Sequence, residues 1–149
     1  MSTHCGIFVK DESDKPHLFK GIYCHFDGYP SYMGVMLEQH YQDPEKIKKL
    51  IKLGNISFLK EKLEPEAGEK HSFSKPAEGV TVAYHRDRGE AYKFYAAHDD
   101  EFFFEVLGRN DFDYVYLYDM QKNEWFVTYQ YGSFEYFKPL KEVLANLNN

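Results

Sequence analysis

The sequence predicts a single α+β domain in which an antiparallel sheet of five or six strands carries a helical insertion between its second and third strands. Three observations support this prediction. Several short segments alternate apolar and polar side chains, as half-buried strands do. Between them lie segments whose apolar residues recur at helical spacing. The chain length of 149 residues matches that of one domain.

The first part of the chain is predicted to form a hairpin followed by helices. The polar loop DESDKP joins the two strands, and Asp27-Gly28-Tyr29-Pro30 ends the second, because these residues favour turns. Asp43-Pro44 starts a helix with a cap and an N-terminal proline, and Gly54 ends it. The expected elements are strands Cys5–Lys10 and His17–Phe26 and helices Ser31–Tyr41, Asp43–Gly54 and Asn55–Leu63.

The second part is predicted to return to the sheet after an exposed loop. Residues 64–78 hold two prolines and four glutamates, which is typical of such a loop. A strand then alternates Val80, Val82 and Tyr84 with smaller residues, and two further segments form the clearest hairpin. The expected elements are strands Gly79–Arg86, Tyr92–Ala96, Tyr114–Met120 and Trp125–Tyr131 and helices Asp99–Leu107 and Pro139–Leu147.

Composition excludes several classes of function. With 18 basic against 24 acidic residues the net charge is −6, which argues against general nucleic-acid binding and against binding to membrane surfaces. No apolar run approaches the roughly 18 residues of a membrane span, and no signal peptide is visible. Two cysteines fit a reducing compartment, so we expect a cytoplasmic protein without cofactors.

The first candidate site is the turn that follows the second strand. His25, Asp27, Tyr29 and Tyr32 surround a strand-to-helix turn, where side chains are often exposed on a rigid support. The free N–H groups at the start of the following helix would attract an anion. The alternative interpretation is structural, with Asp27 as a turn former and His25 as an ordinary strand residue.

The second candidate site follows the third expected strand. His85, Arg86, Asp87 and Arg88 are consecutive, and they include two of the three arginines in the chain. Arginine presents a planar fork that suits phosphate and carboxylate groups. This concentration indicates anion recognition, although the arginines could equally pair with neighbouring acidic residues in a charged turn.

A metal-dependent hydrolase is a third, less favoured possibility. His25, Asp27, His85 and Asp87 could form a site with nitrogen and oxygen ligands only if both strands ended at the same edge of the sheet. The histidines show no H-x-x-x-H spacing and no CxxC pair exists, so no metal is expected.

Aromatic residues are unusually frequent, with 13 tyrosines, 13 phenylalanines and one tryptophan. Tyr114, Tyr116 and Tyr118 lie on one face of a predicted strand, and Trp125 lies on its hairpin partner. Tyrosine is enriched at protein interfaces. We expect either an exposed interface formed by these residues or a tyrosine face covered by helices.

Two stretches resemble a family of small proteins that is widespread in bacteriophages and prophages. They are GIYCHFDGYPSYMGVMLEQHYQDPEKIKKLIKLGNISFLKEK and GVTVAYHRDRGE, and the family carries the motifs IYCHWDGYP and RDRGE. The chain departs from the pattern at Phe26, where tryptophan is usual, and at Asn55, where aspartate is common. The resemblance implies a phage-type accessory protein that acts in the cytosol of the bacterial host.

The leading hypothesis is a non-enzymatic protein that sequesters a small anionic, nucleotide-like ligand, plausibly against host defence and within a homo-oligomer. Arg86 and Arg88 would hold the anion, and Tyr29 or Tyr32 would stack on the ligand. His25 and Asp27 would form hydrogen bonds with its polar edges. The alternative is a protein–protein inhibitor of a host defence enzyme, for example of the anti-CRISPR type, that docks through the tyrosine face.

Overall fold

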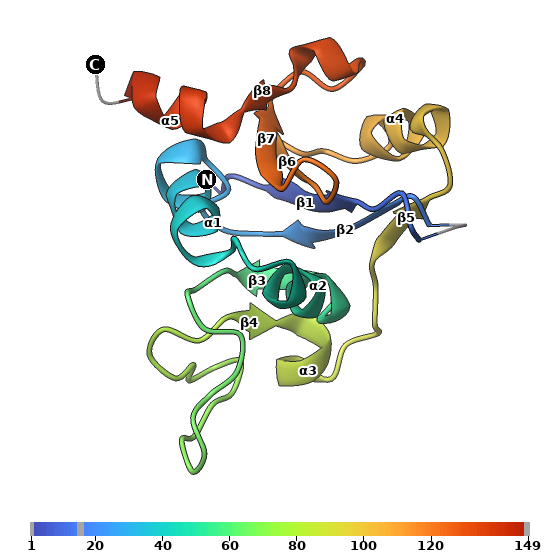
Figure 1. Ribbon diagram of the computed structural model, residues 1–149. Coiled ribbons are helices and arrows are strands. Elements are labelled where there is room, and N and C mark those ends of the chain that lie inside the picture. Colours follow the sequence, from blue (N-terminus) through green and yellow to red (C-terminus); the bar gives the residue numbers. More distant parts are fainter. Residues whose placement is uncertain (1, 15–16, 148–149) are drawn as a thin grey trace.

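The protein is built on one mixed sheet of eight strands (Figure 1). The computed structural model describes residues 2–14 and 17–147. Seven strands follow the order β4-β3-β2-β1-β6-β7-β8, and β5 pairs with β2 beside this path. The strands are β1 (Cys5–Lys10), β2 (Phe19–Cys24), β3 (Ile56–Phe58), β4 (Val82–Ala83), β5 (Tyr95–Ala97), β6 (Tyr114–Asp119), β7 (Glu124–Thr128) and β8 (Lys138–Pro139).

The prediction of a five- or six-stranded antiparallel sheet is therefore wrong. The sheet contains two parallel pairs, β1 with β6 and β2 with β3. Parallel neighbours need long connections, and the helices after β2 supply one of them. Strands β3, β4, β5 and β8 are only two or three residues long, so they leave little alternation in the sequence. The two long hairpins, β1–β2 and β6–β7, are present as expected.

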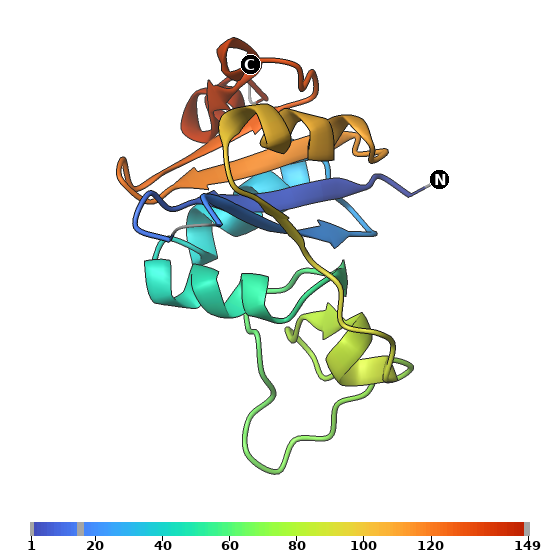
Figure 2. The same ribbon diagram turned by 90° about the vertical axis from the view of Figure 1, so that its right-hand side faces the viewer.

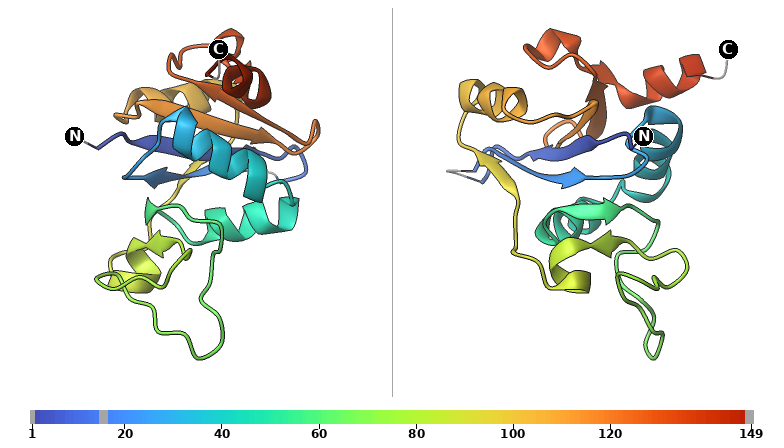
Figure 3. Two further views of the ribbon diagram at one scale, coloured as in Figure 1. Left: turned by 90° about the vertical axis from the view of Figure 1, so that its left-hand side faces the viewer. Right: turned by 180° about the vertical axis from the view of Figure 1, so that it is seen from behind.

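Helices cover both faces of the sheet. Helices α1 and α2 lie across one face, as Figure 3 shows, and α5 packs beside α1. Helix α4 lies over the opposite face, which is turned to the viewer in Figure 2. No helix in the described ranges is long and apolar enough to cross a membrane. The helical segments are η1 (Pro30–Gly34), α1 (Val35–His40), α2 (Pro44–Lys52), α3 (Tyr84–Arg88), α4 (Asp100–Gly108), η2 (Phe134–Tyr136) and α5 (Leu140–Leu147).

Two apolar clusters form the core, one on each face of the sheet. Strand β6 divides them, because Tyr116 and Tyr118 belong to the cluster beneath α1, α2 and α5, whereas Val115 and Leu117 belong to the cluster on the α4 side. Central strands that are buried on both faces have nearly continuous apolar sequences. Close packing also fixes one glycine: a Cβ on Gly21 would lie 2.2 Å from the ring of Phe8.

The expected interface of Tyr114, Tyr116, Tyr118 and Trp125 is not an exposed surface. Tyr116, Tyr118 and Trp125 are at most 1% exposed, and Tyr114 is partly buried against the same cluster. Their polar atoms find partners inside the fold: the Tyr116 hydroxyl donates to the Gly28 oxygen at 2.7 Å, and the Trp125 indole to the Tyr41 oxygen at 2.8 Å. The alternative interpretation, a tyrosine face covered by helices, describes the structure.

Two further predicted elements differ in the structure. The helix expected at Asn55–Leu63 is instead β3 followed by an irregular segment. Of the strand expected at Gly79–Arg86, only the two residues of β4 form a strand, and α3 begins directly after them. The Asp87 carboxylate accepts a hydrogen bond from the backbone N–H of Ala83 at 2.8 Å, which helps to close this short helix. Between β3 and β4 the chain forms a long loop that extends away from the sheet (Figure 1).

Candidate functional site

The turn after β2 holds a small polar cluster around His25. The Tyr23 hydroxyl lies 2.7 Å from Nδ1 of His25 and 3.0 Å from Nδ1 of His4, and the two imidazole rings stack with centroids 4.6 Å apart. Burial lowers the pKa of His25, and the neighbouring His4 lowers it further. His25 was predicted from the sequence but His4 was not, because nothing in the local pattern places the N-terminal segment beside this turn.

The other residues of this turn have mixed roles. Asp27 adopts a φ of 55°, in the left-handed region that residues other than glycine rarely enter. The Tyr29 side chain is 38% exposed and available to a partner. Tyr32 is held within the fold, since its hydroxyl donates to the Leu59 oxygen at 2.7 Å and burial raises its pKa to about 12. Only part of the predicted turn site is therefore free to bind a ligand.

Arg86 and Asp87 hold the long loop onto α3. The Arg86 guanidinium donates to the Asp87 carboxylate at 2.8 Å and to the main-chain oxygens of Leu63 and Thr81 at 2.6 and 2.7 Å. Asp87 also lies 3.1 Å from the His71 ring nitrogen, and its side chain is only 5% exposed. These contacts occupy the donors and acceptors that a ligand would need, so the pair is structural.

His85 and Arg88 are also engaged within the fold. Nδ1 of His85 lies 2.7 Å from the Glu90 oxygen. Arg88 pairs with the Glu90 carboxylate, and its guanidinium lies over the ring of Phe73, 4.1 Å from the centroid, and near that of Tyr84. The arginine-rich segment therefore matches the alternative interpretation, a charged turn whose arginines pair with neighbouring groups.

In the part of the chain that the structure describes, no direct contact joins the two predicted turns. Across residues 2–14 and 17–147, no hydrogen bond, ion pair or ring contact joins residues 25–32 to residues 85–90. They are linked through Asn55, whose side chain accepts from the Tyr23 N–H at 3.0 Å and whose main-chain oxygen accepts from the Tyr84 N–H. Within the same described ranges, no group of three or more His, Cys, Asp or Glu side chains is placed to hold a metal ion.

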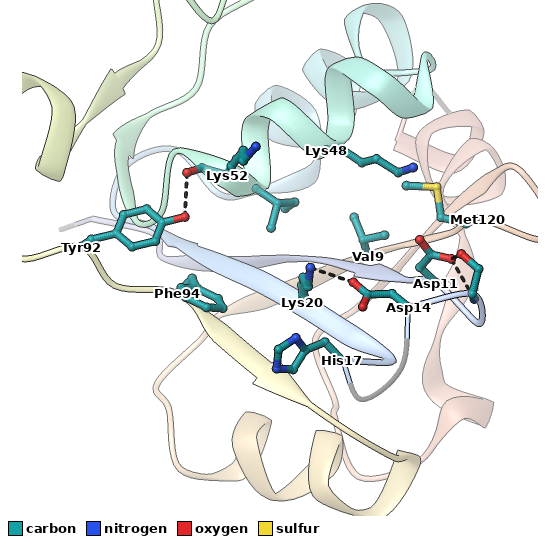
Figure 4. A pocket seen from close by; sticks show the side chains of 12 residues that line it. Val9, Asp11, Asp14, His17, Lys20, Lys48, Lys52, Tyr92, Phe94 and Met120 are labelled. Atoms are coloured by element: carbon teal, nitrogen blue, oxygen red, sulfur yellow. Dashed lines mark hydrogen bonds and ion pairs between the residues drawn. The ribbon is translucent and has the colours of Figure 1, made fainter.

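A cavity lies elsewhere, between α2 and the β1–β2 hairpin. It encloses about 600 Å³, within the usual range of roughly 300–1,000 Å³ for small-molecule sites. Figure 4 shows Tyr92 and Phe94 at one end and Met120 with the hairpin loop at the other. We call this cavity the groove. It is lined by Val9, Asp11, Ser13, Asp14, His17, Lys20, Lys48, Ile51, Lys52, Tyr92, Phe94 and Met120.

One side of the groove is basic because helix α2 presents lysines there. Ile47, Leu50 and Ile51 bury the apolar face of α2, so Lys48 and Lys52 fall at its edge and line the groove. Lys48 has only a weak contact, 3.9 Å, with Glu45 on the same helix, and both side chains are mostly exposed. Exposed pairs of this kind contribute little, so the ammonium group of Lys48 remains available to an anion.

The other side of the groove carries two aromatic rings. The rings of Tyr92 and Phe94 have centroids 5.6 Å apart, and these residues are 45% and 44% exposed. The segment is fixed to the end of α2, where the Tyr92 hydroxyl donates to the Lys52 oxygen at 2.7 Å. Gly54 allows this approach: its φ is 78°, and a Cβ there would lie 2.8 Å from the Lys93 oxygen.

The hairpin-loop end of the groove is polar. Lys20 forms an ion pair of 2.7 Å with Asp14. The Ser13 hydroxyl donates to Asp11 at 2.6 Å, and this hydrogen bond is the main cause of the lowered pKa of Asp11; Lys48 and Lys20 lower it further. Carboxylates beside lysines could accept hydrogen bonds from hydroxyl groups of a ligand while the lysines bind its anionic groups.

The groove was not predicted from the sequence. A strand was predicted at Tyr92–Ala96, but the observed strand β5 is Tyr95–Ala97, so Tyr92 and Phe94 precede it. The pairing of β5 with β2 brings this segment to the end of α2. The clustering of Tyr92 and Phe94 just before a short strand was the only available signal.

Comparison with models of protein families, with curated proteins and with solved structures gave no match.

Proposed function

We propose that the protein binds a small anionic ligand with a flat ring, such as a nucleotide, in the groove and holds it without chemical change. One observation carries this proposal: lysines of α2 and the exposed rings of Tyr92 and Phe94 line the same cavity. The lysines would bind phosphate, and the rings would stack on a base. The apolar floor of Val9 and Ile51 would exclude water from the contact.

The expected affinity follows from these contacts. Stacking of a base on an aromatic side chain contributes about 1–3 kcal/mol. Each charge-assisted hydrogen bond to phosphate contributes roughly 1.5–3 kcal/mol. Removal of Phe94 should therefore weaken binding by about 5- to 150-fold. The groove lies within one chain, so binding does not depend on a second copy, and the homo-oligomer remains a separate prediction.

Titration calorimetry tests the proposal. The wild type is titrated with a panel of cyclic and ADP-ribose-type nucleotides, and the tightest ligand is then titrated into Phe94→Ala, Lys48→Ala and Lys49→Ala. Lys49→Ala is the matched control, since Lys49 is an exposed lysine of α2 outside the groove. We expect weaker binding by the first two variants and unchanged binding by the control.

Equal weakening by Lys48→Ala and Lys49→Ala would show that the lysines act only through net charge. No binding of any panel member at micromolar protein would refute the proposal. Within the phage family that the chain resembles, capture of this kind would withdraw a nucleotide signal from host defence in the bacterial cytosol. The alternative, an inhibitor of a host defence enzyme, was predicted to dock through an exposed tyrosine face. Tyr116 and Trp125 of that face are buried.

A further inference from the structure

A second cavity lies at the edge of the sheet, between strands β3 and β4 and the end of the long loop that joins them. We call it the edge cavity. Its volume is about 440 Å³, within the usual range of roughly 300–1,000 Å³ for small-molecule sites. Phe26, Phe58 and Phe73 line it with aromatic rings, and Lys60 and Glu78 are its charged residues. None of these residues lines the groove, so the two cavities are separate.

The aromatic part of the edge cavity is assembled from three separate segments. Phe26 follows β2, Phe58 ends β3, and Phe73 lies in the long loop. The rings of Phe26 and Phe58 have centroids 6.2 Å apart, and Phe26 is 39% exposed. A flat ring bound here would contact other aromatic rings and cover apolar surface that is otherwise in water. The edge cavity therefore suits a ligand with an aromatic ring.

Buried hydrogen bonds hold the loop side of the edge cavity in place. Ala77 lines the cavity, and its backbone N–H donates to Nδ1 of His71 at 2.9 Å. Because Nδ1 accepts, the proton of this imidazole lies on Nε2, which faces the Asp87 carboxylate at 3.1 Å. The side chains of His71 and Asp87 are only 4% and 5% exposed. This wall is therefore formed before a ligand arrives, which lowers the ordering cost of binding.

Lys60 gives the edge cavity its positive charge. Its ammonium nitrogen lies 4.3 Å from the centroid of the Phe58 ring, a cation–π contact that holds it against the aromatic wall. Within residues 2–14 and 17–147, Lys60 forms no ion pair. Its N–H donors are therefore available to a carboxylate, with which they would form charge-assisted hydrogen bonds.

Glu78 limits the charge of the anion that the edge cavity accepts. Lys60 is half-buried whereas Glu78 is exposed, so solvent screens the carboxylate of Glu78 more strongly than the ammonium of Lys60. A single negative charge would gain from Lys60 and lose little to Glu78. A phosphate with two charges would meet one ammonium here, whereas three lysines line the groove. The edge cavity therefore favours a monoanion.

We propose that the edge cavity binds a small aromatic carboxylate, with its ring against Phe26 and Phe58 and its carboxylate on Lys60. This site goes beyond nucleotide capture in the groove and does not rest on it. Ligands of this size bind in roughly the millimolar range. NMR is the suitable measurement, because it detects binding as weak as this.

The test titrates 3-phenylpropionate and phenethylamine, which share a phenyl ring and carry opposite charges, into the labelled full chain. We expect 3-phenylpropionate to give saturable shifts of the backbone amides of residues 57–60 and 77–82, and phenethylamine to shift them far less. The absence of saturable shifts at these residues, or equally tight binding of phenethylamine there, would overturn the proposal. Shifts confined to residues 48–52 and 92–94 would also overturn it, because they would place the carboxylate in the groove.

Two substitutions test the assigned contacts. Lys60→Gln removes the ammonium group and should weaken binding of 3-phenylpropionate by about 10-fold or more. Phe26→Leu replaces an exposed ring, so the variant should fold, and it should weaken binding by about 2- to 10-fold. Lys70→Gln is the matched control, since Lys70 is an exposed lysine of the same loop outside the edge cavity.

The control should bind 3-phenylpropionate as the wild type does. Equal affinity of Lys60→Gln and the wild type would contradict the contact between Lys60 and the carboxylate. Equal weakening by Lys60→Gln and Lys70→Gln would show an effect of net charge alone, and it would overturn the proposal as well.

Discussion

Replacing Arg86 by alanine tests whether this arginine of α3 stabilises the fold or serves to bind a ligand. Its guanidinium donates to Asp87 at 2.8 Å and to the main-chain oxygens of Leu63 and Thr81. Breaking a buried ion pair costs roughly 3–5 kcal/mol. Because the Arg86 side chain is 28% exposed and Asp87 keeps two other donors, we expect a loss of about 2–3 kcal/mol.

Urea unfolding at pH 7 measures this loss directly. The control is Arg109→Ala, because Arg109 forms an exposed pair with Glu105 that is worth less than about 1 kcal/mol. If Arg86→Ala stays within about 0.5 kcal/mol of the wild type, the usual spread for surface substitutions, the structural role assigned to this arginine is refuted.

The same pair gives a pH dependence. Burial raises the pKa of Asp87, but hydrogen bonds from Arg86, the Ala83 N–H and His71 outweigh it, so the net pKa lies below its ordinary value. A carboxyl whose pKa is lower in the folded protein stabilises the fold at pH values above about 3.9, which is its pKa in the unfolded chain. This stabilisation is lost as the pH falls from there through the pKa of the folded state. The difference in stability between the wild type and Arg86→Ala should therefore shrink below about pH 3.9. A stability difference that stays constant as the pH falls would show that the Asp87 carboxyl is not the source of this pH dependence.

Three further substitutions test the fold. Tyr116→Phe removes the buried hydrogen bond to the Gly28 oxygen and should cost about 1–2 kcal/mol in urea unfolding; no loss would argue against burial of the tyrosine face. Gly21→Ala places a Cβ against the Phe8 ring and should cost about 1–3 kcal/mol, seen as a lower Tm, whereas an unchanged Tm would contradict the packing. Asp43→Ala removes the cap of α2 and should cost about 1 kcal/mol, and an equal helix content and Tm would argue against the cap.

Long elements with strong local signals were predictable from the sequence. Strand β1 occupies the predicted residues, and α2 begins at the predicted proline, because alternation and capping are encoded within a few neighbouring positions. Strand β3 was missed and the strand that contains β4 was predicted too long, since two or three residues carry no periodic pattern. Their pairing depends on long-range packing against β2, which no local pattern records.

The candidate site was predictable only in part. The sequence drew attention to His25, yet its partner His4 lies 21 residues earlier and meets it only through the β1–β2 pairing. Arg86 was interpreted as a ligand residue because local sequence does not reveal that it binds the main chain of a distant loop. The groove depends on four separate segments, and none of them carries a motif for a ligand site.

One NMR titration tests the central claim most directly. Nucleotides that bind in the calorimetric panel are added to labelled wild type, and backbone amide shifts are followed. We predict that the largest changes fall on the groove, at Lys20, Lys48, Lys52 and residues 92–94, and that they are lost in Phe94→Ala. Changes confined to residues 25–32 and 85–88 would contradict binding in the groove and would show that the ligand binds at the two turns.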